Sequence, residues 1–403
     1  MAASFSQSLK VLELASVLAG PAVGLFFAEL GAEVIKVENL LTAGDVTRCW
    51  RLPQESSNTD ISAYFSCINW GKRSLALNLK TAEGLAIIQK LAAQADIVIV
   101  NYKPGDAEKL GVDAASLRKQ NPGLIYAHLT GYGPDNSRAG FDALIQAETG
   151  FVDLNGESEG PGLKMPVALM DLLAAHQLKE AILIALLERQ ATGQGALLEI
   201  GLFQSGLVSL ANQASAWLQA GQLPQRMGSE HPSIVPYGTV YSCQQNQKLM
   251  LAVGNDAQFK ALCEVLGCPE LIQNQRFQTN PLRVQNRQQL HPLLQTRIEN
   301  FQRQALLTRL WQAKVPAGAL HTVAEALEQP EAQALLLKAE KAGSSYLGLR
   351  SLAFAPPQGL ETLLPPPHLG EHSQELLVAL GLSLSEIQSL EKAGIILTQN
   401  MFE

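Results

Sequence analysis

Short apolar runs alternate with amphipathic segments along the first half of the chain. Residues 9–14 read as an apolar strand, and the small-residue stretch 15–20 that follows reads as a loop. Pro21 suits the first turn of a helix that should end at Gly31, and 33–38 predicts a second strand. Because a strand–loop–helix–strand order is typical of βαβ units, this pattern predicts an α/β fold with a parallel sheet.

The same alternation continues beyond this unit. The pattern predicts a helix capped by Thr81 and running to about 94, a helix ending at 120, and a long helix that Asp171 opens and Gly193 closes. Further strands are predicted at 74–79, 96–100, 124–129 and 197–200.

The stretch from about 221 to 330 has fewer βα alternations and more Gln, Asn and Arg. Residues 237–241 and 249–253 suggest an antiparallel pair, and 257–266 and 303–314 suggest helices. This predicts a smaller, separate α+β domain. An amphipathic helix is expected from Ser373 in the C-terminal segment.

Composition narrows the class of protein. Charged residues make up 17% of the 403 residues and hydrophobic residues 47%, and 30 basic against 37 acidic side chains give a net charge of −7. A charged share of about 25% is usual, so this chain must hide much apolar surface in a large core or against a partner subunit. The composition excludes a disordered protein, the length predicts two or three domains, and the acidic balance argues against nucleic-acid binding.

Cysteine usage and hydropathy indicate the compartment. The five cysteines are odd in number and none shows C-x-x-C spacing, so neither a disulfide framework nor a zinc site is expected. The start is too short for a signal peptide, and the uncharged stretch 200–225 carries several Gln and Asn side chains that would be costly in hydrocarbon. We therefore expect a cytoplasmic protein without a membrane segment.

Three motifs resemble known sites without matching them. The first βα loop contains Gly20 but lacks the G-x-G-x-x-G fingerprint of dinucleotide-binding loops, so NAD binding is not expected. The G-x-S-x-G match at 156–160 lacks the flanking strand and helix of a nucleophile elbow, so a surface loop is expected. His368 and His372 are separated by Gly370 after a proline run, which does not predict a metal site.

Two carboxylates, Asp171 and Asp142, could each have either a structural or a chemical role. Asp171 at a helix start could be an N-cap, contributing about 1 kcal/mol, or a shielded nucleophile that attacks a carbonyl or thioester. Asp142 follows the glycine-rich stretch 131–140, and that stretch comes after a predicted strand whose carboxyl end could border a site. A flexible surface loop with a helix-capping Asp142 is the alternative.

The ordered set of motifs resembles the family III CoA-transferases, which include formyl-CoA transferase and carnitine CoA-transferase and are related to α-methylacyl-CoA racemase. The resemblance covers nearly the whole chain. Each matching segment is short, but the occurrence of all the segments in this order is specific to the family. It rests on segments 11–21, 30–38, 44–48, 71–80, 101–105, 131–133, the Asp171 segment, 189–195, 236–238, 254–256 and 365–372.

The resemblance implies a mechanism. The family's nucleophile is an aspartate just before a long helix, which corresponds to Asp171. Its carboxylate would attack an acyl-CoA thioester to give a mixed anhydride and CoA thiolate, then an aspartyl-CoA thioester, and CoA would pass to a carboxylic acid. CoA is thus a substrate, and no tightly bound cofactor is expected.

The resemblance also implies contacts with CoA. Most of these residues follow strands of the predicted sheet, although Leu18 and Leu77 could instead be core residues and Lys109 could belong to a solvated helix face. The implied contacts are Val17, Leu18, Leu77, Asn101, Tyr102, Lys109 and Leu110, with Arg73 and Lys103 as nearby basic candidates.

Departures from relatives shape the substrate hypothesis. Formyl-CoA transferase has Gln in place of Leu18 and Arg in place of Asn39, and it carries a glycine run in its small domain, so formyl-CoA and oxalate are less favoured. Racemases have a proton-transferring His where this chain has Phe141, which disfavours a racemase or epimerase. A non-catalytic relative that binds CoA esters is the third hypothesis.

The family fold implies the domain arrangement. Residues 1–203 would start a large Rossmann-like CoA-binding domain, 204–224 would form a linker, 225–328 a small domain, and 329–403 a second linker with a return to the large domain. The resemblance further implies that two chains interlock as a homodimer.

Overall fold

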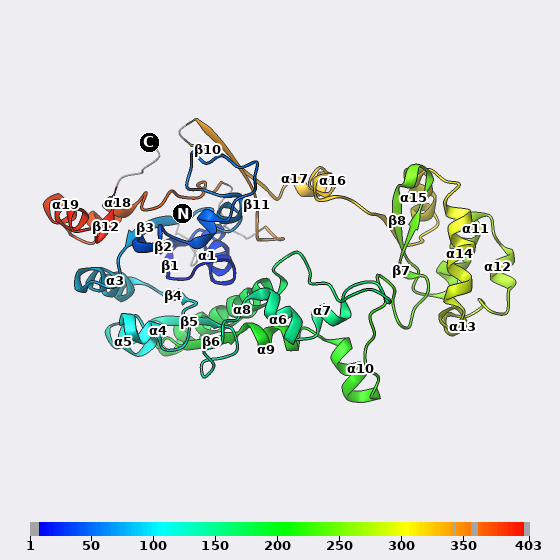
Figure 1. Ribbon diagram of the computed structural model, residues 1–403, viewed down its shortest axis with the longest axis horizontal. Coiled ribbons are helices and arrows are strands. Elements are labelled where there is room, and N and C mark those ends of the chain that lie inside the picture. Colours follow the sequence, from blue (N-terminus) through cyan, green and yellow to red (C-terminus); the bar gives the residue numbers. More distant parts are fainter. Residues whose placement is uncertain (1–7, 342, 356–361, 399–403) are drawn as a thin grey trace. The chain divides into compact units, whose positions relative to one another are not determined.

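The computed structural model describes residues 8–341, 343–355 and 362–398. These residues fall into two compact units (Figure 1). Unit 1 combines residues 1–149, 165–212 and 334–403, and unit 2 combines residues 150–164 and 213–333. Each unit has its own hydrophobic core.

Unit 1 is built on a seven-stranded sheet. Its order is β12-β3-β2-β1-β4-β5-β6, in which all neighbours are parallel except β12, which runs antiparallel to β3. Strands β1 to β6 lie in the order β3-β2-β1-β4-β5-β6, which is the order of doubly wound nucleotide-binding sheets. This confirms the prediction of an α/β fold with a parallel sheet. The strands are β1 (Lys10–Glu13), β2 (Glu33–Asn39), β3 (Arg73–Leu77), β4 (Ile97–Val100), β5 (Ile125–Thr130), β6 (Leu197–Gly201) and β12 (Ile396–Leu397).

Alternating side chains of this sheet face two layers of helices. Leu12, Leu75, Val98 and Val100 point to one face. They pack with apolar residues of α3 (Ala82–Gln94), α5 (Ala114–Gln120), α18 (Ser373–Ala379) and α19 (Leu384–Lys392). On the other face α1 (Ala19–Glu29) and α8 (Leu169–Thr192) pack against each other, and α8 also contacts β5 and β6. The sheet is therefore covered on both sides, as the apolar runs in its strands require.

The helices of unit 1 range from single turns to the long α8. Thr81 caps α3 and Gly193 closes α8, as predicted. The helices are α1 (Ala19–Glu29), η2 (Leu40–Thr42), η3 (Val46–Cys49), α2 (Ala63–Ser66), α3 (Ala82–Gln94), α4 (Asp106–Leu110), α5 (Ala114–Gln120), α6 (Asp142–Glu148), α8 (Leu169–Thr192), α9 (Leu202–Val208), α18 (Ser373–Ala379) and α19 (Leu384–Lys392).

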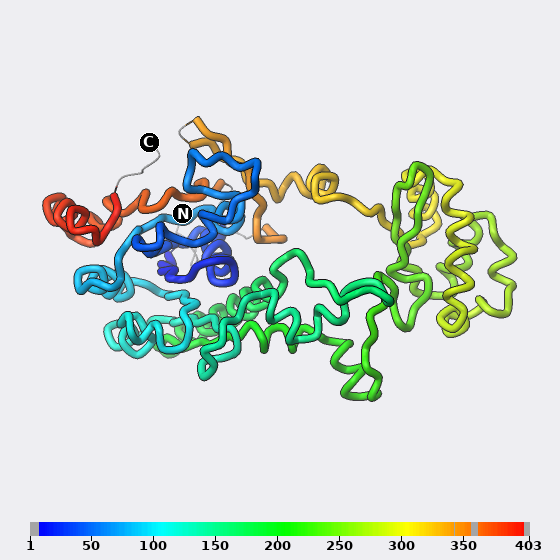
Figure 2. The backbone as a smooth tube through the Cα atoms, in the orientation of Figure 1, coloured from blue at the N-terminus to red at the C-terminus, as the bar shows by residue number. Residues whose placement is uncertain are grey.

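The C-terminal segment returns to the N-terminal part of unit 1. Figure 2 shows the orange-to-red end of the chain beside the blue beginning. The hairpin β10 (Leu336–Lys341) and β11 (Ser344–Leu349) comes first, and β12 then closes the edge of the sheet against β3. The Glu29 carboxylate accepts the backbone N–H of Ser351 at 2.6 Å, which ties this return to α1.

Unit 2 contains a three-stranded antiparallel sheet and a helical layer. The predicted antiparallel pair is confirmed as β7 (Tyr237–Ser242) and β8 (Lys248–Ala252), to which β9 (Ala317–Ala319) adds. Its other elements are α7 (Phe151–Leu154), α10 (Asn212–Ala220, beginning at the unit boundary), η4 (Gln244–Asn246), α11 (Asp256–Leu266), α12 (Glu270–Gln273), α13 (Asn280–Gln285), α14 (Arg287–Ile298), α15 (Arg303–Gln312), α16 (Val323–Leu327) and α17 (Pro330–Gln333).

Candidate active site

A pocket opens at the carboxyl ends of β1, β4 and β5 in unit 1. It measures about 230 Å³ and is lined by the loops that follow these strands, by residues 138–142, and by Asp171 and Leu202. β1 and β4 are neighbours at the point where the strand order reverses. Doubly wound sheets bind their ligands at this position, because the loops on either side diverge and leave a crevice.

Asp171 lies in the first turn of α8 and lines the pocket. The helix begins at Leu169 and its N-cap position is Ala168, so the prediction that Asp171 opens the helix as an N-cap is wrong. Among the described residues, no hydrogen bond or ion pair engages the Asp171 carboxyl group. Burial, followed by the nearby negative charge of Asp142, raises the pKa of Asp171 to about 7.

Asp142 fixes the chain directly before Asp171. It is the first residue of α6, but its Oδ1 accepts the N–H of Met170 at 2.8 Å, so it caps α8 rather than its own helix. Gln146, which is fully buried, donates to Asp142 Oδ2 at 2.7 Å and accepts the N–H of Met165 at 2.8 Å. These bonds pin the segment that leads into α8, and sequence spacing carried no signal for them.

The glycine-rich loop between β5 and α6 closes tightly on itself. A Cβ on Gly140 would lie 2.1 Å from the Gly131 Cα, and a Cβ on Gly131 would lie 2.6 Å from the Gly140 Cα. Real Cβ atoms do not approach backbone so closely, so only glycine permits this contact at either position. Both residues line the pocket, and the contact brings the two ends of the loop together beside Asp171.

The residues expected to contact CoA fall into two groups. The pocket is lined by Val17, Leu18, Asn101, Tyr102 and Lys103, which come from the loops after β1 and β4. Burial raises the pKa of the Tyr102 phenol to about 12, so this side chain stays neutral.

The other four expected residues lie outside the pocket lining. Leu77 is fully buried in β3, and Leu110 packs against the sheet core. Lys109 is exposed on α4 and pairs with Asp106 at 2.7 Å, and Arg73 pairs with Glu33 and Glu375.

The family model for CoA-transferase family III matches residues 7–373. The chain belongs to this family. It is 36% identical over 395 residues to the succinate–glutarate CoA-transferase of Agrobacterium fabrum, a match that covers 96% of each chain. It is 32% identical to the human succinyl-CoA:glutarate CoA-transferase, covering 92% of this chain and 85% of that one. The chain is therefore an enzyme, a CoA-transferase whose substrates are CoA thioesters.

A solved structure supports the fold of this CoA-transferase. The CAIB/BAIF family protein from Brucella suis superposes with a TM-score of 0.83 at 39% identity, covering 94% of this chain and 99% of that chain. The agreement extends over the mixed α/β architecture with its large parallel-sheet domain.

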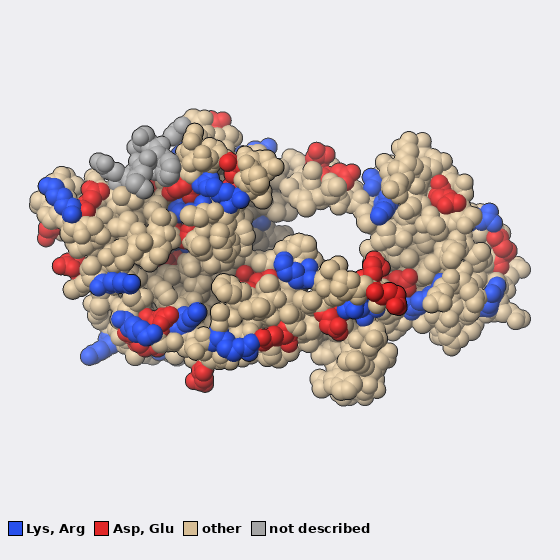
Figure 3. Space-filling model, in the orientation of Figure 1, with Lys and Arg blue, Asp and Glu red and all other residues tan. Residues whose placement is uncertain are grey.

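Two cationic side chains line the pocket of the transferase, Lys103 and Arg138. The Arg138 guanidinium pairs with Glu148 and lies 4.3 Å from the centre of the Tyr132 ring. On the face drawn in Figure 3, basic side chains lie over the region of α4 and α5 with acidic side chains among them. Phe141, the residue that replaces the racemase His, also lines the pocket with its side chain exposed.

Residues 8–341, 343–355 and 362–398 contain no group of three or more His, Cys, Asp and Glu residues that could hold a metal ion. The Nδ1 atom of His368 instead forms a hydrogen bond with Asp60. No helix within these ranges has both the length and the apolar character needed to cross a membrane.

Proposed function

We propose that Asp171 is the nucleophile of CoA transfer. Its carboxylate attacks the carbonyl carbon of an acyl-CoA, the C–S bond breaks, and an aspartyl–acyl anhydride and CoA thiolate result. The thiolate then attacks the Asp171 carbonyl, which releases the first carboxylate and leaves an aspartyl-CoA thioester. The acceptor acid takes CoA through the same two steps in reverse, so every bond formed is matched by one broken.

The supporting observation is a carboxyl group without polar partners in the described chain, in a pocket at the switch point of the sheet. A pKa of about 7 means that a large fraction of Asp171 is ionised at neutral pH. The ionised form lacks the hydrogen bonds that would quench its reactivity. Water is the competing nucleophile for an anhydride, and the closed Gly131–Gly140 loop restricts its access.

The CoA moiety is proposed to extend from this pocket along α4. Val17, Leu18, Asn101 and Tyr102 would surround the thioester end, because they line the pocket with Asp171. Lys103 and Lys109 would meet phosphates as point charges further out. Leu77, Leu110 and Arg73 have no direct contact with CoA in this proposal.

The acceptor is proposed to be a dicarboxylic acid. Relatives from Agrobacterium fabrum and Homo sapiens are named for succinate and glutarate. One carboxylate of such an acid must reach Asp171, and the other needs a cation. Arg138 lines the same pocket and its planar guanidinium suits bidentate carboxylate binding, for which it would exchange its pairing with Glu148.

The predicted domain boundaries, the interlocked homodimer and the cytoplasmic location belong to this proposal. α8 carries Leu183, Ile184 and Leu187 with 41%, 58% and 66% of their surface exposed. A partner subunit that covers this stripe would account for the low charged fraction of the chain. Sedimentation should then report a dimer, and a monomer at micromolar concentration would contradict this part of the proposal.

The test of the nucleophile is mass spectrometry of the protein after incubation with acyl-CoA donors and hydroxylamine, which traps an activated carboxyl group as a hydroxamate. We expect the adduct on the peptide that contains Asp171. Asp171→Asn should give no adduct and no turnover, while Asp135→Asn, in the exposed glycine-rich loop, should keep both. An adduct on another carboxylate, or turnover by Asp171→Asn, would refute the assignment.

The alternative functions have their own readouts. A racemase or epimerase would exchange solvent deuterium onto the α-carbon of an acyl-CoA without any acceptor acid, and with Phe141 in place of His we expect no such exchange. A non-catalytic CoA-ester-binding relative would bind CoA and leave a broad panel of acyl-CoA and acid pairs unchanged.

A further inference from the structure

Val17 has an unusual backbone conformation in the pocket wall. Its φ is 72°, in the left-handed region that a β-branched residue rarely adopts. Such a conformation is energetically costly and persists only where the surroundings enforce it. Because Val17 lines the pocket beside Asp171, the contacts that enforce its conformation shape the binding surface.

The two residues before Val17 are held through their backbone groups. Asn101 Oδ1 accepts the N–H of Ser16 at 3.1 Å, and Asn101 Nδ2 donates to the Ser16 carbonyl at 2.7 Å. The Lys36 ammonium donates to the Ala15 carbonyl at 3.0 Å. The loop after β1 therefore follows a path that neighbouring side chains dictate.

Val17 itself is held by Asp45. Its N–H donates to both carboxylate oxygens, at 3.3 Å to Oδ1 and 3.2 Å to Oδ2. Asp45 Oδ1 also accepts from the N–H and the hydroxyl of Thr47, at 3.1 and 2.8 Å, and Oδ2 pairs with Lys36 at 2.9 Å. The carboxylate thus has a fixed orientation, with one oxygen directed to Thr47 and the other to Lys36.

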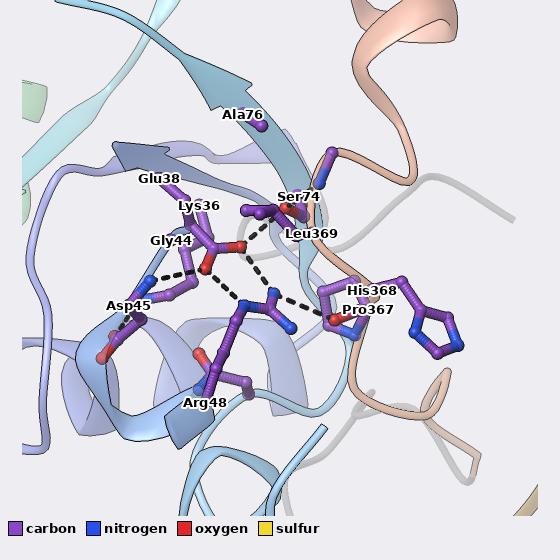
Figure 4. A network of polar contacts seen from close by, with 12 residues as sticks. Lys36, Glu38, Gly44, Asp45, Arg48, Ser74, Ala76, Pro367, His368 and Leu369 are labelled. Carbon is purple, nitrogen blue, oxygen red and sulfur yellow. Dashed lines mark hydrogen bonds and ion pairs between the residues drawn. The ribbon is translucent and has the colours of Figure 1, made fainter. Parts of the chain in front are cut away.

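Asp45 belongs to a buried charge network. Glu38 Oε2 accepts the N–H of Asp45 at 3.0 Å, and Arg48 bridges Glu38 to the carbonyl of Pro367 (Figure 4). Burial disfavours the Asp45 anion, but the charge and hydrogen bond of Lys36 and the two hydrogen bonds from Thr47 together outweigh it and hold the Asp45 pKa below its usual value. Asp45 is consequently charged across the physiological range, unlike Asp171.

We propose that Asp45 is a positioning residue for acyl-CoA binding, because its carboxylate holds Val17 in the left-handed conformation that turns the loop after β1 toward the pocket. This inference rests on the proposed function, since it assumes that CoA occupies the pocket that Asp171 lines. The network behind Asp45 supplies the rigidity that the strained residue requires.

The variant Asp45→Asn weakens this hold with little change in shape. Its remaining oxygen can still accept from Thr47 and, across the 3.3 Å contact, from the Val17 N–H. The negative charge is lost, however, and the amide nitrogen then faces two donors, the Val17 N–H and the Lys36 ammonium. We expect the Kd for free CoA, measured by calorimetry, to rise roughly tenfold. A change of this size corresponds to the loss of about one charged hydrogen bond. kcat at saturating acyl-CoA should change much less than kcat/KM.

A second substitution tests the conformational cause. Glycine adopts positive φ without cost, so in a Val17→Gly background Asp45→Asn should change the Kd for CoA by no more than about twofold. An equal loss in both backgrounds would overturn the proposal. Asp60→Asn is the matched control, because Asp60 pairs with Arg48 in the same network but does not contact the loop. It should lower the melting temperature without altering CoA binding, and a tenfold loss there would also overturn the proposal.

Stability alone provides a check that does not depend on function or on Asp45→Asn folding. Glycine normally destabilises a protein relative to alanine. At Val17 we expect the opposite order, with Val17→Gly melting higher than Val17→Ala, because alanine keeps the penalty at φ 72°. The usual order would show that Val17 is not strained and would refute the proposal. If the order holds but CoA binds to none of the variants, the fault lies in the proposed function.

Discussion

The Asp142 carboxylate holds the chain immediately before Asp171 and at the same time opposes the ionisation of Asp171. The first effect follows from the 2.8 Å bond that Asp142 accepts from the N–H of Met170. The second follows from its negative charge, which adds to burial in raising the Asp171 pKa to about 7. One carboxylate therefore positions the proposed nucleophile and, together with burial, raises the pH at which it becomes ionised.

Replacing Asp142 with Asn should separate these two effects. The amide oxygen can still accept the Met170 N–H, while the negative charge and the hydrogen bond from Gln146 Nε2 are lost. The ionised form of Asp171 is then less disfavoured, so the rise of kcat/KM with pH should move to lower pH than in the wild type. A pH profile of initial rates with one acyl-CoA and one acid measures this. An acid limb that stays in place would show that Asp142 does not influence the ionisation.

The raised pKa of Asp171 also makes a prediction for stability. Between about pH 3.8 and 7 the folded protein retains this proton and the unfolded chain does not, so stability falls as pH rises through that window. Above pH 7 Asp171 is ionised in both states, and the loss of stability has reached its full value. Asp171→Asn should therefore be more stable than the wild type at pH 8 by roughly 2–4 kcal/mol, and close to it at pH 4. Urea titrations at both pH values test this, and an equal difference at both would contradict the raised pKa.

The contact between Gly131 and Gly140 predicts a costly substitution. Gly140→Ala places a methyl group 2.1 Å from the Gly131 Cα, which forces the loop apart. We expect a loss of roughly 1–3 kcal/mol in unfolding free energy and more hydrolysis of acyl-CoA for each transfer completed. Gly318→Ala is the control, because a Cβ there meets no atom within 4 Å and should change stability by less than about 0.5 kcal/mol. Equal behaviour of the two variants would refute the close approach.

Arg138 should determine the preference for dicarboxylic acids. Arg138→Gln removes the guanidinium but can still pack on Tyr132. We expect the KM for succinate or glutarate to rise roughly tenfold, with little change for a monocarboxylic acceptor such as butyrate. Steady-state kinetics with both acid classes measure the ratio. A parallel loss for both classes would assign Arg138 a general structural role through Glu148 instead.

The two lysines near α4 should contribute differently to CoA binding. Lys103 lines the pocket, whereas Lys109 is 75% exposed and is paired with Asp106. Lys103→Ala should weaken CoA binding severalfold, and Lys109→Ala should do so less, because Lys109 must first release Asp106 and is screened by salt. Calorimetry at two ionic strengths gives both values. A larger effect from Lys109 would place the CoA phosphates farther along α4.

Local pattern was sufficient for most of the elements. Apolar runs bounded by small residues located the strands from β1 to β6 within one or two residues, and Thr81 and Gly193 marked helix ends as their chemistry requires. The start of α8 was misplaced, because an Asp near an apolar run is also a typical N-cap. The residue that fills the capping role is Asp142, which lies 28 positions before Met170, and no periodicity links them.

The amino-acid sequence was enough to predict the α/β class, the smaller antiparallel domain, the order of the strands along the chain and a set of motifs that resembles one enzyme family. These features depend on side-chain periodicity and on short-range turn chemistry, and both can be recognised from residues that are close together in the sequence. The tertiary structure alone decided which of the candidate residues share a pocket and which lie elsewhere. It also decided the pKa of Asp171 and the hold of Asp45 on Val17. Burial and charge–charge distances govern those properties, and both arise only when segments far apart in sequence pack together.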